Sequence, residues 1–271
     1  MVIDQPEIVN GLQTTQEIFD HFIDGNPQPD DARNVLIRVI VPSGERARNQ
    51  IIKATNNQTP VNPLSLHATD RLHFDIEDRL ALYELFYDRR KGHYRHLRKN
   101  LAQIVSPRDL ARAVIAVVLQ QADDARARPQ SLTNNKDKYP QVFNDDFNRD
   151  VFVACILLDR QIEAYLSTRN DLGKDERRDI RFYVDMWIVS ELTGKAKPAP
   201  DDIANLAANM VSPIFPGLLN AVTHEVLATY QTMVKNLTDQ GITGAADKVA
   251  KGPDFNAKIL EMLEAKFPVP F

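Results

Sequence analysis

Cysteine is nearly absent from this sequence: Cys155 is the single one among 271 residues. One cysteine cannot form an internal disulfide or a cysteine-based zinc site, so the disulfide-stapled and cysteine-zinc classes are excluded. The residue lies within the apolar run Val151–Leu158. We therefore interpret Cys155 as a buried structural thiol.

Long apolar runs and a strong net charge are also missing. No stretch approaches the roughly 20 apolar residues that a helix needs to cross a bilayer. The first residues, Met1–Pro6, show neither the basic start nor the apolar core of a signal peptide. We therefore expect a cytoplasmic protein without a membrane partner. Because the formal net charge is only -4, any contact with nucleic acid must come from a local cationic patch.

Residues 1–64 follow the pattern of a βαβα unit. Glu7–Val9 predicts a short strand, and a helix follows it. The helix carries its apolar side chains on one face: Ile18, Phe19, Phe22 and Ile23. Val35–Val41 is rich in β-branched residues and almost continuously apolar, as in a strand covered on both faces. A second helix runs to about Ala54. Two strands do not form a stable sheet, so further strands must come from elsewhere or from an N-terminal part that this chain lacks.

Residues 65–271 are predicted to form a helical domain. Ser106, Pro107 and Asp109 are typical of a helix N-terminus. Residues 122–144 are polar and predict a long surface loop. Further helices are expected at about 145–169, 175–193, 201–211, 218–237 and 254–266, with Gly194 ending the second of them. Core positions at helical spacing include Leu72, Ile76, Leu80, Tyr83, Tyr183, Trp187 and Ile188. The expected fold class is α+β and predominantly α, with an incomplete βαβα unit before the helices.

Two polar motifs in residues 1–64 are candidate ligand sites. The first comprises Asn10, Gly11, Gln13 and Thr14, where a strand leads into a helix through a glycine. The unpaired N–H groups of a first helical turn bind phosphate and other anions, although a tight turn with a threonine cap explains the same residues. The second comprises Asn56, Asn57 and Gln58. Their amides suit bases, ribose or main chain, but such residues are also common where a helix ends.

A third motif concentrates positive charge between residues 87 and 99. The candidate nucleic-acid contacts are Tyr87, Arg89, Arg90, Lys91, Tyr94 and Arg95. Arginine and lysine pair with phosphates, and tyrosine rings stack on bases. The alternative is a solvated loop, or ion pairs with acids such as Glu77 and Asp78. His93 and His96 lack a carboxylate or cysteine at ligand spacing, so we predict no metal site there.

Three ordered motifs resemble those of the AIPR (abortive infection phage resistance) family. They are Ile8-Val9-Asn10-Gly11-x-Gln13-Thr14, then Ala54-Thr55-Asn56-x-Gln58-x-Pro60-Val61, then Tyr87-Asp88-Arg89-Arg90-Lys91-Gly92-x-Tyr94. The resemblance covers residues 7–120 well and implies a bacterial anti-phage defence protein. Family members carry a substantial region before the first motif. The resemblance therefore implies that this chain corresponds to the C-terminal part of such a protein.

More distantly, residues 1–64 resemble ParB-type and DGQHR-type domains. In ParB the glycine helix and the asparagine motif hold CTP, each with an arginine, whereas Thr14 and Thr59 occupy those positions here. Neither threonine can make the bidentate, charge-assisted contacts of arginine to a triphosphate. The likeness favours a ParB-like fold and argues against CTP hydrolysis.

Three hypotheses about function follow. The first is a defence protein that binds a phosphate-bearing ligand, above all nucleic acid, through the first helix N-terminus and the basic segment. The second is a nuclease or nucleotide hydrolase whose site needs a missing N-terminal region or a partner. The third is a protein-interaction module that senses infection. No catalytic residue, cofactor or oligomeric state follows from the sequence.

Overall fold

The structure is a computed structural model that describes residues 67–268 and, before them, Thr15, Ile18–Phe19, Phe22–Ile23, 34–41, Gly44, Ala47, Ile51 and Leu64. The chain divides into two compact units, Met1–Asn62 and Pro63–Phe271. Among the described residues, no helix combines the length and the hydrophobicity needed to cross a membrane.

In the first unit the two predicted helices are confirmed where the structure describes them. The helical residues are Thr15, Ile18, Phe19, Phe22, Ile23, Ala47 and Ile51. The prediction of a covered strand at Val35–Val41 is wrong, because these residues form no strand and Leu36 and Val41 are 98% and 89% exposed. A strand needs a pairing partner, and no described residue of this unit lies in a strand. The predicted strand Glu7–Val9 lies outside the described residues.

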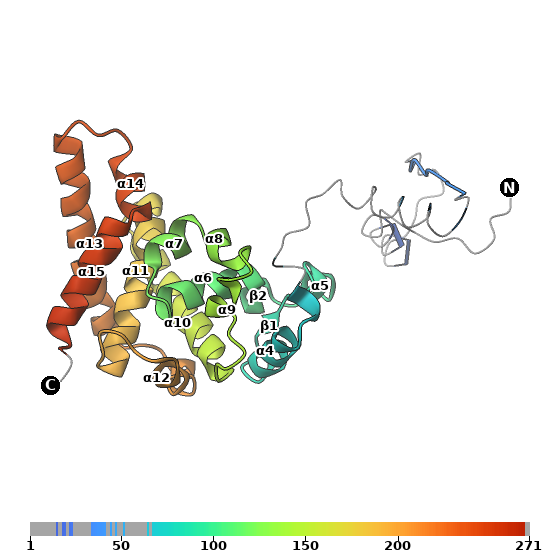
Figure 1. Ribbon diagram of the computed structural model, residues 1–271, viewed down its shortest axis with the longest axis horizontal. Helices are drawn as coiled ribbons and strands as arrows, with labels where there is room; N and C mark the ends of the chain where they lie inside the picture. Colours follow the sequence, from blue (N-terminus) through green and yellow to red (C-terminus); the bar gives the residue numbers. More distant parts are fainter. Residues whose placement is uncertain are drawn as a thin grey trace. The chain divides into compact units, whose positions relative to one another are not determined.

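The second unit is helical, which confirms the predicted fold class (Figure 1). Its two strands are short and parallel, and they pair Phe86 with Ile104 and Tyr87 with Val105. The elements in chain order are η1 His67–Thr69, α4 Arg71–Ala81, β1 Phe86–Tyr87, α5 His93–His96, η2 Leu101–Gln103, β2 Ile104–Val105, α6 Pro107–Val117, α7 Ala122–Ala127, α8 Gln130–Thr133, α9 Tyr139–Val142, α10 Asp150–Thr168, α11 Lys174–Thr193, α12 Pro200–Ala204, η3 Asn209–Val211, α13 Pro216–Asp239, α14 Ala245–Lys251 and α15 Pro253–Lys266.

Helices α10 and α11 form the centre of this unit. Helix α10 packs against α4, α6, α11 and α12, and α11 packs against α6, α7, α13 and α15. Because both helices are surrounded, buried residues occur on every side of them, and Val151–Ile156 are all buried. The burial of Cys155, Tyr183, Trp187 and Ile188 confirms that they are core residues.

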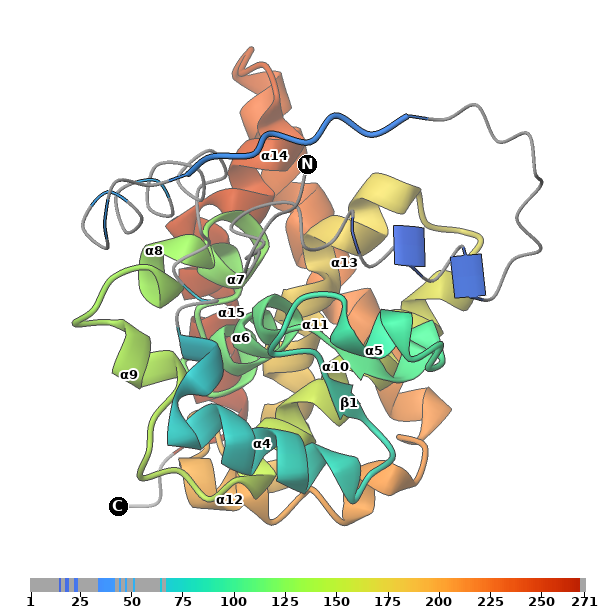
Figure 2. The same cartoon turned by 90° about the vertical axis from the view of Figure 1, so that its right-hand side faces the viewer.

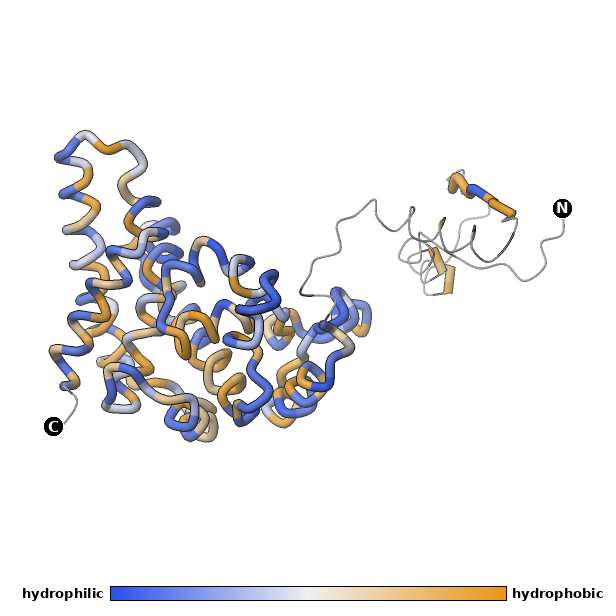
Figure 3. The backbone as a smooth tube through the Cα atoms, viewed as in Figure 1, coloured by the Kyte–Doolittle hydropathy of each residue, from blue (hydrophilic) through white to orange (hydrophobic). Residues whose placement is uncertain are grey.

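Helices α4 and α5 lie at one end of the unit, and α13 and α15 lie at the opposite end (Figure 1, Figure 2). Helix α13 buries one face only, through residues three and four apart: Leu219, Val222, Thr223, Val226 and Tyr230. Polar and apolar residues accordingly alternate along it (Figure 3).

The predicted loop 122–144 is wrong, because it contains α7, α8 and α9. These helices are short, and α7 buries small residues, Ala122 and Ala125, which give no apolar periodicity. The predicted helix 201–211 is split into α12 and η3, and the sequence predicted no helix at the position of α14. By contrast, the predicted cap at Ser106 is confirmed, since its side chain accepts a hydrogen bond from the Asp109 N–H at 3.1 Å.

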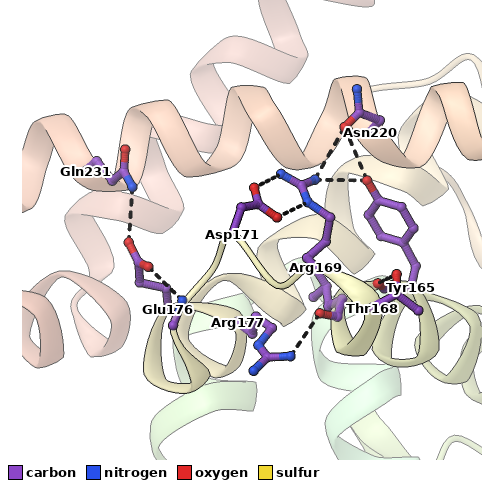
Figure 4. Close-up of polar contacts among 10 residues, drawn as sticks. Tyr165, Thr168, Arg169, Asp171, Glu176, Arg177, Asn220 and Gln231 are labelled. Carbon is purple, nitrogen blue, oxygen red and sulfur yellow. Dashed lines mark hydrogen bonds and ion pairs between the residues drawn. The ribbon is translucent and has the colours of Figure 1, made fainter.

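Exposed polar contacts join α13 to the loop between α10 and α11 (Figure 4). Arg169 forms a bidentate pair with Asp171 at 2.7 and 2.6 Å and donates to the Tyr165 hydroxyl at 2.9 Å. The Tyr165 hydroxyl and Arg169 both reach Oδ1 of Asn220 on α13, at 3.3 and 3.4 Å. Exposed pairs of this kind contribute little to stability, because solvent screens their charges.

Asn256 of α15 holds the buried turn between α6 and α7. Its Oδ1 accepts a hydrogen bond from the Ala122 N–H, and its Nδ2 donates to the Gln120 carbonyl, both at 2.9 Å. Gln120 itself has a positive φ of 52°, and its side-chain amide donates to the Ala196 carbonyl at 2.7 Å. The backbone groups of this turn are therefore satisfied by side chains distant in the sequence.

Replacing Asn256 with alanine should leave one buried N–H and one buried carbonyl without partners. We expect Asn256→Ala to lower the free energy of unfolding by roughly 2–4 kcal/mol, measured by urea denaturation. The control is Asn236→Ala on the exposed face of α13, where we expect a change within about 0.5 kcal/mol. Equal losses in the two variants would contradict the role of Asn256.

Candidate nucleic-acid interface

The predicted ligand residues of the first unit, Asn10, Gly11, Gln13, Thr14, Asn56, Asn57 and Gln58, lie outside the described residues. They stay predictions. The basic segment, residues 87–99, is described in full. It begins at the end of β1 and includes α5 (Figure 2).

Asp88 closes the turn that places the basic segment. Its carboxylate accepts hydrogen bonds from the Gly92 N–H at 2.7 Å and from the Tyr94 N–H at 3.3 Å. Gly92 has a φ of 86°, a conformation that residues with a Cβ rarely adopt. The carboxylate of Asp88 is thus bound to backbone N–H groups of the turn and forms no ion pair with the cations that follow it among the described residues.

Arg89, one of the predicted phosphate contacts, is bound to other parts of the protein. Its Nε donates to Glu77 at 2.5 Å, and its Nη1 donates to the Ala68 carbonyl at 2.7 Å. The guanidinium also lies over the ring of Phe74, 3.8 Å from the ring centre. The ion pair with Glu77, which the sequence left open as an alternative, is therefore the one that Arg89 makes.

The two tyrosines of the segment are anchored in the protein. Tyr87 is fully buried, so the prediction that its ring stacks on a base does not fit its position. Tyr94 is half-buried and donates its hydroxyl to Glu77 at 2.8 Å, and burial raises its pKa to about 12. The crevice beside these rings has a volume of about 50 Å³, well below the 300 Å³ or more of ordinary ligand pockets. Any polymer must therefore bind to exposed side chains and not enter the protein here.

Arg90, Lys91 and Arg95 are three of the exposed cations of the segment. None of them has an ion pair within the part of the chain that the structure describes. Lys99 is also exposed, and its ammonium lies 4.7 Å from the ring centre of Phe86. The exposed cations therefore extend outward from a turn that Glu77 and Asp88 hold in place.

A buried histidine lies next to this turn and contacts its Tyr87. His73 lies between two tyrosine hydroxyls, with Nδ1 2.7 Å from Tyr87 Oη and Nε2 2.6 Å from Tyr139 Oη. In the neutral ring one nitrogen donates and the other accepts, so both hydroxyls are satisfied. Burial lowers the pKa of His73 to about 4. No pattern in the sequence indicated this network, because Tyr139 is 66 residues away.

The central helices contain a second charged cluster that the sequence did not indicate. Arg181 of α11 forms a bidentate ion pair with the buried Asp159 of α10, at 2.8 and 2.5 Å. Asp185, one turn further along α11, is fully buried, and neither of its carboxyl oxygens has a partner among the described residues. Burial, and then the negative charge of Asp159, raise the pKa of Asp185 well above its ordinary 3.8, although Arg181 opposes the shift.

Comparison with known proteins gives one match. A family model described as "AIPR protein" matches residues 1–239. Searches of curated proteins and of solved structures found no significant match.

His73 should make stability depend on pH between its ordinary and its lowered pKa. Because the unfolded imidazole binds a proton near pH 6.5 and the buried one near pH 4, the native state loses stability as the pH falls through this window. The loss amounts to roughly 3 kcal/mol. We expect the stability difference between wild type and His73→Gln to change by about this amount from pH 7 to pH 4, as measured by urea denaturation. His224→Gln, at an exposed position of α13, should keep the wild-type profile.

The raised pKa of Asp185 predicts that stability changes with pH in the opposite direction. A carboxyl whose pKa is raised on folding favours the native state at low pH, and this advantage is lost as the pH rises through the folded pKa. Asparagine has the same shape and no charge at any pH. Asp185→Asn should therefore raise the thermal midpoint relative to wild type at pH 8, and the gain should shrink toward pH 4. A gain that did not depend on pH would contradict the protonation of Asp185.

Proposed function

The chain belongs to the AIPR family, and from the family's role in abortive infection against phage we propose that it binds nucleic acid through Arg90, Lys91 and Arg95. The observation that carries the proposal is the exposure of these three cations, without counter-charges among the described residues, on a turn fixed to the protein. The expected partner is single- or double-stranded nucleic acid of the infecting phage or of the host.

The arrangement of the turn suits contact with a phosphate backbone. Phosphate contacts dominate nucleic-acid affinity and release bound counter-ions, so a few cations suffice when they are exposed together. The overall charge of -4 would repel a polyanion, which makes a local patch the required mode of contact. The burial of Tyr87 removes one predicted base-stacking ring, and we therefore propose contact with phosphates without base-specific recognition.

A fixed turn lowers the entropy lost on binding. Asp88 holds the backbone of the turn, and Glu77 holds Arg89 and Tyr94 at its base. The exposed arginines and the lysine must still lose side-chain freedom on binding, but the backbone is already ordered. We therefore assign Arg89 and Tyr94 positioning roles, and Arg90, Lys91 and Arg95 the contacts themselves.

The proposal is tested by fluorescence anisotropy of labelled single- and double-stranded DNA and RNA across a series of salt concentrations. If three phosphates are neutralised, the logarithm of the binding constant for duplex DNA should fall with the logarithm of salt concentration with a slope of about -2.7. Arg90→Glu/Arg95→Glu should weaken binding by about tenfold or more at low salt and should reduce this slope.

The matched control is Lys174→Glu/Lys235→Glu, which changes the net charge equally at exposed positions of α11 and α13. It should retain most of the binding, since the effect of Arg90 and Arg95 is local. If both double variants lose binding equally, the attraction is general and the proposed surface is wrong. Cleavage of the labelled strand during the assay would favour the hydrolase hypothesis over simple binding.

A further inference from the structure

A cavity of about 580 Å³ lies between α6, α10, α11 and the segment Leu101–Ile104. Its volume is in the range of pockets that hold metabolites and other small molecules. The three helices that line it pack directly against one another (Figure 1, Figure 2). The cavity shares no lining residue with the exposed cations Arg90, Lys91 and Arg95.

Arginine and carboxylate side chains meet in this cavity. It is lined by three arginines and three acids: Arg112, Arg160, Arg181, Asp109, Asp159 and Glu163. Arg181 is matched twice, by Asp159 and by Glu163, whose Oε1 lies 2.5 Å from its Nη1. Asp109 accepts a hydrogen bond from the Ser106 hydroxyl at 2.7 Å and belongs to the N-terminus of α6. Asp159 and Glu163 are thus paired with Arg181, whereas Asp109 has no ion pair among the described residues.

Arg112 and Arg160 have no carboxylate partner among the described residues. Arg112 donates its Nε to the Ala125 carbonyl at 2.9 Å and lies over the ring of Phe182, 4.6 Å from the ring centre. Arg160 donates to the carbonyls of Ala102 and Ile104. Carbonyl partners hold the two guanidinium groups in place, but they do not neutralise them.

The electrostatic setting of these arginines differs from that of Arg181. Burial lowers the pKa of both Arg112 and Arg160, and for Arg112 the positive charges of Arg181 and Arg108 lower it further. The pKa of Arg181 is raised, because the charge of Asp159 and its hydrogen bonds outweigh burial. The charges of Asp109 and Asp159 oppose this shift at both arginines, but neither acid forms an ion pair with Arg112 or Arg160. A bound anion would add the direct ion pair that these half-buried guanidinium groups lack.

We propose that this cavity binds a small molecule with one anionic head group, a phosphate or a carboxylate, which pairs with Arg112 and Arg160. Both groups accept two parallel hydrogen bonds from a guanidinium fork. The apolar lining, which includes Ile104, Ile156 and Phe182, would cover the uncharged part of the ligand. A polyanion does not suit the site, because Asp109 and Glu163 would repel its further charges.

The test is isothermal titration of the full chain with inorganic phosphate, acetate and adenosine monophosphate. Binding of any of the three supports the proposal, and the comparison among them tells phosphate from carboxylate and shows whether the apolar lining contributes. Arg112→Gln should raise the dissociation constant of the bound probe by about tenfold or more, because a charge-assisted pair is lost. If none of the three probes binds, the proposal is overturned.

Two controls keep the result interpretable. Arg178→Gln removes an exposed arginine of α11 that does not line the cavity, and it should leave binding unchanged. Arg160→Lys keeps the positive charge but loses the planar fork, so it should weaken binding without unfolding the protein. If Arg160→Lys keeps its thermal midpoint and binds as tightly as wild type, the assignment of Arg160 is wrong. Arg90→Glu/Arg95→Glu should bind the probes normally, which separates this site from the proposed nucleic-acid surface.

Discussion

The ion pair between Asp159 and Arg181 links the two central helices, and much of the charged chemistry of this protein depends on it. A buried carboxylate needs a partner of opposite charge, and a guanidinium on the neighbouring helix provides it in bidentate form. Burial and the charge of Asp159 raise the pKa of Asp185, and the charge of Arg181 opposes this shift without forming an ion pair with Asp185. Asp159, paired with Arg181, forms no ion pair with Arg112 or Arg160, so these two guanidinium groups remain available to a ligand.

Glu77 has a comparable role at the α4–α5 end. A single carboxylate accepts hydrogen bonds from Arg89 and from Tyr94, and it fixes the start and the middle of the basic segment to α4. The same pairing divides the cations of the segment into two classes. Arg89 is consumed in building the turn, whereas Arg90, Lys91 and Arg95 extend outward from it. These cations are close together in the sequence, but in the fold Arg89 anchors the turn whereas Arg90, Lys91 and Arg95 are exposed on it.

Prediction from the sequence succeeded where the signal is local. The cap at Ser106, the end of α11 at Gly194 and the long helices were found because capping residues and apolar spacing act within a few residues. It failed at Val35–Val41, where apolar β-branched residues predicted a covered strand but pairing partners decide whether a strand forms. It failed again at 122–144, where helices packed through small residues leave no periodic pattern.

The sequence by itself determined the family, the predominance of helix and the position of the positive charge near residue 90, because motifs, periodicity and composition are written in neighbouring residues. Only the tertiary structure decided which of those charges reach solvent. Arg89 lies beside Glu77, His73 lies between Tyr87 and Tyr139, and Arg112 lines a cavity without an ion-pair partner among the described residues. Each of these facts is a pairing, or a missing pairing, between residues that are far apart in the chain, and only the packing of the helices brings such residues together.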